Sequence, residues 1–156
     1  MTNESKETRV FEVSDSGNRG GSHKDVKPSS RTDLVTEFEL LSHYGTYGDV
    51  VENAINISDL GAEAVLGARF HVRVMDETVE LTELSKVFDP EGRRVGVNEI
   101  YGKHTVDSGG KVIHYETVHR FDTSGWQPGW YSAEFVIRDL HRDVVSEPAT
   151  VEFELR

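Results

Sequence analysis

Apolar and polar residues alternate with a period of two over most of the chain after residue 33. The clearest run is 68–74, in which Ala, Phe and Val occupy one face and Arg and His the other. The same alternation recurs at 34–42, 50–58, 112–121, 130–138 and 150–155. Because successive side chains of a β-strand point to opposite faces, each run predicts a half-buried strand.

Turn-forming residues separate these runs at regular spacing. The turn sequences are SDLGAEA at 58–64, DPEG at 89–92, DSGG at 107–110 and SGWQPG at 124–129. DPEG lies between two strand-like stretches and indicates a hairpin. Segment 77–86 leaves strand and helical turn open, and no long helix is predicted. The pattern therefore predicts an all-β fold, an antiparallel β-sandwich of about seven strands over residues 31–156.

Residues 1–30 lack this alternation and differ in composition from the rest of the chain. They are rich in Ser, Gly and charged residues, and they cannot bury enough apolar surface to offset the entropy lost on ordering. Val10, Phe11 and Val13 form a small apolar group within them. We therefore expect a flexible polar arm. It is either a disordered tail or an arm whose apolar anchor docks on a neighbouring subunit.

The composition of the 156 residues limits the classes of function. The chain has no cysteine, which excludes disulfides, thiolate metal sites and cysteine nucleophiles. Its net charge of −11 argues against binding to nucleic acid or to anionic membranes. No apolar run is long enough to span a bilayer and the polar start differs from a signal peptide, so we expect cytoplasmic synthesis and no membrane insertion. Such an acidic chain is typical of salt-loving organisms, although a mesophilic acidic domain has the same totals.

The histidines and carboxylates do not form a recognisable catalytic or metal-binding motif. His114 and His119 are five residues apart, which places them on opposite faces of one strand. His71 lies between two arginines, which repel a cation. His119 is on an inward face, where a hydrogen-bonded core residue is expected. The sequence therefore predicts a protein that is not an enzyme and that has no cofactor and no metal site.

Two parts of the chain resemble prokaryotic Ig-like, adhesion-type domains. Residues 51–61 followed by 67–74 resemble the second and third strands of that group, with a polar, Gly-containing corner between two alternating runs. Residues 107–110 and 128–131 resemble the entries to its last strands, and the Gly-x-Tyr at 129–131 is also similar to fibronectin type III domains and to sugar-binding domains of polysaccharide exporters. The resemblance implies an Ig-like fold and carries over no functional residue. Gly129 would permit the corner, and the Tyr131 hydroxyl is expected to reach the backbone, as in a tyrosine corner.

An Ig-like strand order would place strands 66–75, 130–139 and 148–155 in one sheet. Its outer face would then carry a group of basic residues together with Glu134, Glu152 and Glu154. The basic residues are Arg69, His71, Arg73 and Arg138. Arginine is enriched in interfaces and binds carboxylates in a fork, so this face is predicted to bind a protein partner. The alternative is a solvated ladder of cross-strand ion pairs.

Two tryptophans form the other candidate site. Trp126 lies in the 124–129 turn, and Trp130 points outward at the start of a strand. Exposed flat rings suit both sugars and protein interfaces, whereas Trp126 could instead close one end of the core. The predicted function is a non-catalytic structural or interaction module of a larger assembly, such as a surface layer, filament or virion, bound to another protein or to itself. The alternative is a carbohydrate-binding module that uses Trp126 and Trp130 to hold a polysaccharide.

Overall fold

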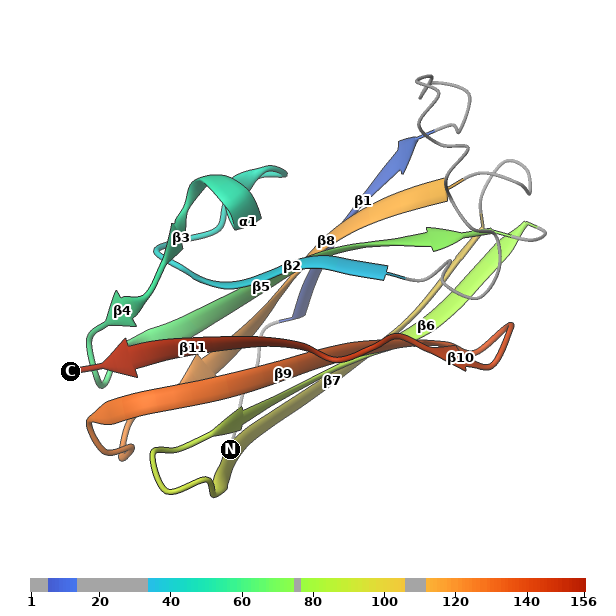
Figure 1. The fold of residues 1–156 in the computed structure, drawn as a ribbon. Helices are drawn as coiled ribbons and strands as arrows, with labels where there is room; N and C mark the ends of the chain where they lie inside the picture. Colours follow the sequence, from blue (N-terminus) through green and yellow to red (C-terminus); the bar gives the residue numbers. More distant parts are fainter. Residues whose placement is uncertain (1–5, 14–33, 75–76, 106–111) are drawn as a thin grey trace.

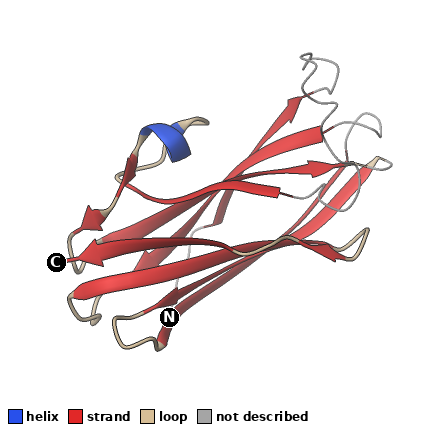
Figure 2. Ribbon diagram, viewed as in Figure 1, coloured by secondary structure: helices blue, strands red, loops and turns tan. Residues whose placement is uncertain are grey.

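The computed structural model describes residues 6–13, 34–74, 77–105 and 112–156 (Figure 1). Nearly all the regular structure is β-strand (Figure 2), and the long strands lie in two sheets whose apolar faces meet. The predicted all-β sandwich is thereby confirmed. Within the described ranges the one helix is α1 (Asp49–Glu52), and no helix there is long and apolar enough to cross a membrane.

The first sheet is antiparallel throughout. Its strand order is β1 (Lys6–Val13), β8 (Val112–Asp122), β5 (Glu63–Arg73), β2 (Leu34–Leu41) and β3 (Ala54–Ile55). Strand β8 is paired with β5 along its whole length and with β1 over residues 112–119. This sheet carries the candidate residues of the 68–74 run on β5.

The second sheet is antiparallel except for one short parallel pair. Its strand order is β4 (Ile57–Ser58), β11 (Ala149–Leu155), β9 (Gly129–Asp139), β6 (Thr78–Phe88) and β7 (Arg94–Thr105), with β10 (Val144–Val145) paired to β9. Strand β4 is the parallel partner of β11. The chain passes from the first sheet to the second at Asn56, between β3 and β4.

Residues 6–13 differ from the predicted flexible arm, because they form β1, which is antiparallel to β8 of the same chain. The anchor residues Val10, Phe11 and Val13 belong to this strand, with Val10 opposite Tyr115 and Phe11 opposite His114 in the register. The N–H and C=O groups on the side of β8 that faces away from β5 are paired with this short stretch. The composition of the stretch alone does not predict this pairing. The remainder of the predicted arm lies outside the described residues.

The predicted strand at 50–58 is wrong in its first part. Residues 49–52 form α1, and only the short strands β3 and β4 follow. The Asp49 carboxylate accepts hydrogen bonds from the backbone N–H groups of Gly45 and Thr46, and Gly48 adopts a left-handed φ of 107°. These local bonds, together with the complete burial of Val50, override the strand preference of the two valines.

Segment 77–86, which the sequence left open, belongs to β6. Its even-numbered residues are half-buried and its odd-numbered residues face the core. Two of the inward positions are held by Glu83 and Ser85, which hides the period of two in the sequence.

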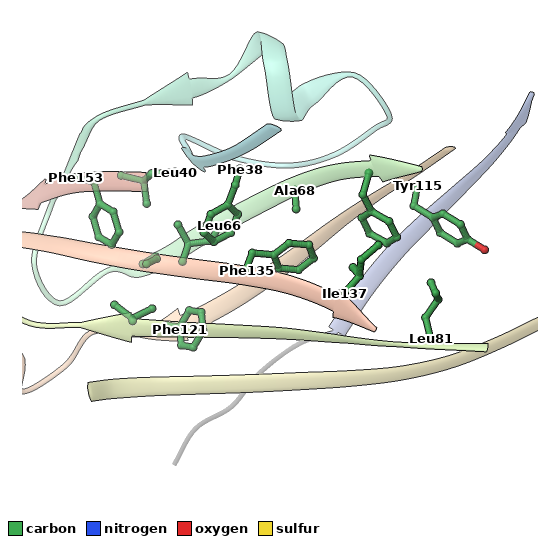
Figure 3. Close-up of a cluster of buried hydrophobic side chains, with 14 of the residues drawn as sticks. Phe38, Leu40, Leu66, Ala68, Leu81, Tyr115, Phe121, Phe135, Ile137 and Phe153 are labelled. Carbon is green, nitrogen blue, oxygen red and sulfur yellow. The ribbon is translucent and has the colours of Figure 1, made fainter. Parts of the chain in front are cut away.

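The core lies between the two sheets and is rich in aromatic rings (Figure 3). Phe135 on β9 is at its centre: its ring lies 5.4 Å from that of Phe38 and 5.9 Å from that of Phe70. The Phe70 ring is stacked on that of Tyr115 at 5.0 Å. Side chains from β2, β5, β8 and β9 thus join the sheets into one packed unit.

A buried polar cluster joins β6 to β8 inside this core. Ser85 Oγ lies 2.6 Å from His119 Nδ1, and His119 Nε2 lies 3.2 Å from Glu83 Oε1. The Thr117 hydroxyl donates to the same Glu83 oxygen at 2.6 Å. The prediction that His119 is a hydrogen-bonded core residue is confirmed, since only 1% of it is exposed. Buried polar groups of this kind are stable when their hydrogen bonds are made within the protein.

Candidate functional site

The four basic residues predicted to share a face are divided between the two sheets. Arg69, His71 and Arg73 lie on β5 in the first sheet, whereas Arg138 lies on β9 in the second. The prediction of one common face is wrong because β5 pairs with β2 and β8 rather than joining β9. Arg138 is half exposed and pairs with Asp143 at 2.7 Å. That these residues contact a protein partner stays a prediction.

Arg69 has a partner within its own chain. Its Nη2 lies 2.8 Å from Oε2 of Glu116, whose side chain is fully buried, and its guanidinium lies 4.9 Å from the centre of the Tyr47 ring. The other Glu116 oxygen accepts hydrogen bonds from the Tyr44 hydroxyl and the Gly48 N–H, each at 2.9 Å. Glu116 therefore ties residues 42–53, which we call the cap segment, to the outer face of the first sheet.

The cap segment also makes apolar contacts with that face. Val50 and Tyr44 form a small buried cluster with Leu41, Val65 and Val118. Gly67 of β5 makes the close approach possible: a Cβ atom there would lie 2.6 Å from Leu41 Cδ1 and 2.9 Å from Val50 Cγ2. Residues 42–49 thus form a bend that covers part of the sheet.

His71 is the second of the predicted partner residues. It lies opposite His114 in the register of β5 and β8, with ring centres 5.4 Å apart. Its Nδ1 is buried and has no hydrogen-bond partner in the described part of the chain. Burial, followed by the charges of His114 and Arg73, lowers the pKa of His71 from 6.5 to about 4.

This lowered pKa predicts a loss of stability in acid. Between about pH 6.5 and about pH 4 the unfolded chain binds more protons than the folded one, so stability rises with pH in that window. We expect the free energy of unfolding to fall by at most roughly 3 kcal/mol as the pH is lowered through it. Urea unfolding at about pH 7 and about pH 4 measures the effect. His71→Gln should reduce the difference while His43→Gln, at an exposed site, should not; an equal reduction in both would contradict the assignment.

A pocket of about 450 Å³ lies where two loops meet at one end of the sandwich. The loops are the β6–β7 turn and the segment between β8 and β9. Because β6 is antiparallel to both β7 and β9, the end of β6 and the start of β9 fall at the same end of the sheet. The lining residues are Asp89, Arg93, Arg94, Val95, Gly125, Trp126, Gln127 and Tyr131.

Trp126 has its ring fixed by a stack of aromatic side chains. It lies on the Tyr131 ring at 5.4 Å with an angle of 14° between the planes, and Tyr131 lies on Phe153 at 6.0 Å. The Tyr131 hydroxyl donates to the Gln127 carbonyl at 2.5 Å, which confirms the predicted contact with the backbone. Trp126 therefore covers the end of the core and also lines the pocket.

The opposite wall is built on Asp89, which holds the β6–β7 turn closed. Its carboxylate accepts the N–H groups of Glu91 and Arg93 at 2.9 and 2.8 Å and the Arg93 Nε at 3.0 Å. Burial acts to raise the pKa of Asp89, but these hydrogen bonds and the Arg93 charge outweigh it and lower that pKa. The Arg94 side chain has no ion pair among the described residues, so its charge is available to a ligand.

Trp130, the other predicted aromatic, does not line this pocket. It projects from the outer face of β9, 55% exposed, opposite Glu154 of β11. The two tryptophans are therefore not parts of one site. Sequence reasoning found Trp126 but missed Asp89, Arg93, Arg94 and Gln127. Both turns, DPEG and SGWQPG, are visible in the sequence. They would have indicated this site if the antiparallel pairing of β6 with β9 had been anticipated, because that pairing brings the two turns to the same end of the sheet.

Comparisons with known proteins do not show a family. No protein-family model matches the chain, and no curated protein matches it. Among solved structures, a Bacteroides uniformis beta-glucuronidase matches with a TM-score of 0.46 and 9% identity, over 78% of this chain and 14% of that one. A family 123 glycoside hydrolase from Clostridium perfringens matches with a TM-score of 0.43 and 9% identity, over 79% of this chain and 26% of that one. The chain thus spans a small part of both, and likeness at this level carries no argument about function.

A metal centre receives no support from the residues that the structure describes. Within them, no group of three or more His, Asp or Glu side chains lies close enough together to hold a metal ion. His114 lies on the outer face of β8 and His119 on its inner face, as their spacing predicted.

Proposed function

We propose that the protein is a non-catalytic binding module whose loop pocket holds a saccharide against Trp126. The observation that carries the proposal is the pairing of one flat aromatic ring with planar hydrogen-bonding groups around a concave site. Sugar rings present C–H faces that pack on aromatic rings, and their hydroxyls bond in the plane of guanidinium and amide groups. The side chains with such groups on the pocket wall are those of Arg93, Arg94 and Gln127, and the Arg94 guanidinium makes no ion pair among the described residues.

The rigidity of the pocket supports this proposal. Trp126 is stacked on the core through Tyr131, and Arg93 is held by Asp89 and Glu91. Gln127 donates from its amide to the Glu91 carboxylate, so both loops are joined across the pocket. Groups that are already ordered lose little entropy when a ligand binds, which favours affinity for small ligands.

Trp126→Ala is expected to weaken saccharide binding by at least about tenfold, because the ring supplies the packing surface. Trp130→Ala is the matched control, since it removes a tryptophan from outside the pocket. The measurement is a screen of the full chain against neutral and acidic oligosaccharides, followed by calorimetric titration of the best ligand. Tryptophan fluorescence should still respond to that ligand in Trp130→Ala and should cease to respond in Trp126→Ala.

Because Trp126 also covers the end of the core, its removal could weaken the fold. Arg94→Ala changes an exposed pocket residue without touching that stack and should also weaken binding, with an unchanged melting temperature. Absence of binding to every oligosaccharide tested, or equal affinity of the wild type and both pocket variants, would overturn the proposal.

A further inference from the structure

Strand β7 forms one edge of the second sheet (Figure 1). It is twelve residues long, and no strand of the described chain pairs with its outer side. Its inner side is paired with β6 along almost its whole length. A long edge strand presents a row of free N–H and C=O groups to which another strand can bind.

Two large apolar side chains on the outer face of β7 are exposed to solvent. Val97 is 42% exposed and Tyr101 is 56% exposed, and Glu99 and Lys103 lie beside them on the same face. We propose that β7 pairs with β7 of a second copy of this chain, antiparallel about a two-fold axis that passes beside Tyr101. The second sheet would then continue from one copy into the other.

The order of the charges along β7 selects this register. With Tyr101 opposite itself, Glu99 of each copy lies directly opposite Lys103 of the other, and Val97 lies opposite Thr105. Directly opposite residues of an antiparallel pair have Cβ atoms about 4.5–5.5 Å apart, within reach of an ion pair. Centring the axis on Glu99 or on Lys103 would instead place like charges together, and centring it on Ile100 would leave Glu99 opposite Tyr101.

Within one copy the charges of Glu99 and Lys103 are not compensated by an ion pair among the described residues. Lys103 lies opposite Glu80 in the register of β6 and β7, but the Glu80 carboxylate accepts the Tyr101 hydroxyl at 2.6 Å. The pairing between copies would give both charges a partner, twice over because of the two-fold axis.

The inner face of β7 gives an independent indication. Asn98 is 5% exposed, and its buried Nδ2 has no acceptor in the described part of the chain. The proposed register places His104 of the second copy directly opposite Asn98. The His104 ring packs on Tyr115 of its own copy, with ring centres 5.7 Å apart. A histidine ring nitrogen can accept a hydrogen bond from an amide, so the register that pairs the charges also brings this ring opposite the Asn98 amide.

Charge reversal tests the pairing on the full chain by sedimentation equilibrium over a wide range of concentration. The wild type should form dimers. Glu99→Lys and Lys103→Glu should each raise the dimer dissociation constant by at least about tenfold, because each places like charges together at both ends of the interface. The double variant Glu99→Lys with Lys103→Glu should restore the wild-type constant. Glu152→Lys makes the same charge change at an exposed site on β11 and should leave it unchanged.

A cysteine cross-link provides a measurement that does not depend on affinity. The chain has no cysteine, so Tyr101→Cys introduces a single thiol at the axis, where opposite Cβ atoms come within about 1 Å of the separation that a disulfide needs. Oxidation should give a covalent dimer for Tyr101→Cys and none for Glu152→Cys. A wild type that is monomeric up to millimolar concentration, a dimer unaffected by the single reversals, or equal cross-linking at both positions would overturn the proposal.

Discussion

Glu116→Gln is expected to lower the free energy of unfolding by about 3 kcal/mol, near the lower end of what breaking a buried ion pair costs. The Glu116 side chain is fully buried, and its two oxygens accept bonds from Arg69, Tyr44 and the Gly48 backbone. An amide in its place keeps one acceptor and turns an NH₂ group toward these donors. The Arg69 guanidinium, only a quarter exposed, keeps as its countercharge the partly exposed Glu37 carboxylate, which lies 3.9 Å from its Nε.

Glu63→Gln provides the matched control for this prediction. Glu63 also pairs with an arginine across β5 and β8, since Arg120 Nη1 lies 3.3 Å from it, but the Glu63 side chain is half exposed. Exposed ion pairs contribute less than about 1 kcal/mol. Urea unfolding followed by circular dichroism measures both variants. Equal losses would mean that burial around Glu116 does not set the strength of its bonds.

Phe135→Ala is expected to cost about 3–5 kcal/mol, the usual range for removing a buried aromatic side chain. The ring is fully buried and contacts the rings of Phe38, Phe70 and His119, the last in a T-shaped arrangement. Its loss leaves a cavity at the centre of the core that the neighbouring rings fill only in part, since Phe70 is held in its stack on Tyr115. The expected result is a large decrease in the urea midpoint with little change in slope.

Val136→Ala tests the strand alternation at the next residue. Val136 faces outward on β9 beside Leu84 and is only half-buried. We expect a loss below about 1 kcal/mol, as for partly exposed sites in general. A larger loss in Val136→Ala than in Phe135→Ala would contradict the assignment of the two faces of β9.

The strands themselves could be predicted because the alternation of apolar and polar residues within a strand depends on which of its own two faces meets the core. In 68–74 and 130–138, one face meets the core and the other meets solvent or the cap segment, so the alternation is visible in the sequence. The alternation weakens where a polar residue is buried with a partner from a distant strand. Glu83 is an example, because its acceptor role depends on Thr117 and His119 of β8.

The arrangement of the strands could not be predicted in the same way. Which strand pairs with β5 depends on contacts far apart in sequence, and the assumption that β5 shares a sheet with β9 placed Arg69 and Arg138 on one face. The candidate pocket shows the same limit. Trp126 is conspicuous in its own loop, whereas Arg94 becomes part of the site only because β6 pairs with both β7 and β9.

The position of β11 has a consequence for how the protein is made. This strand pairs with β9 and with β4, packs against β2, and supplies Phe153 and Leu155 to the core. A ribosome completes β2, β3 and β4 long before it reaches β11, so the early strands emerge without the partner that closes the sandwich over them. Sandwiches dominated by such distant pairings fold slowly. We therefore expect the nascent chain to remain open until β11 has been synthesised, with its apolar faces exposed during that interval to aggregation and to chaperones.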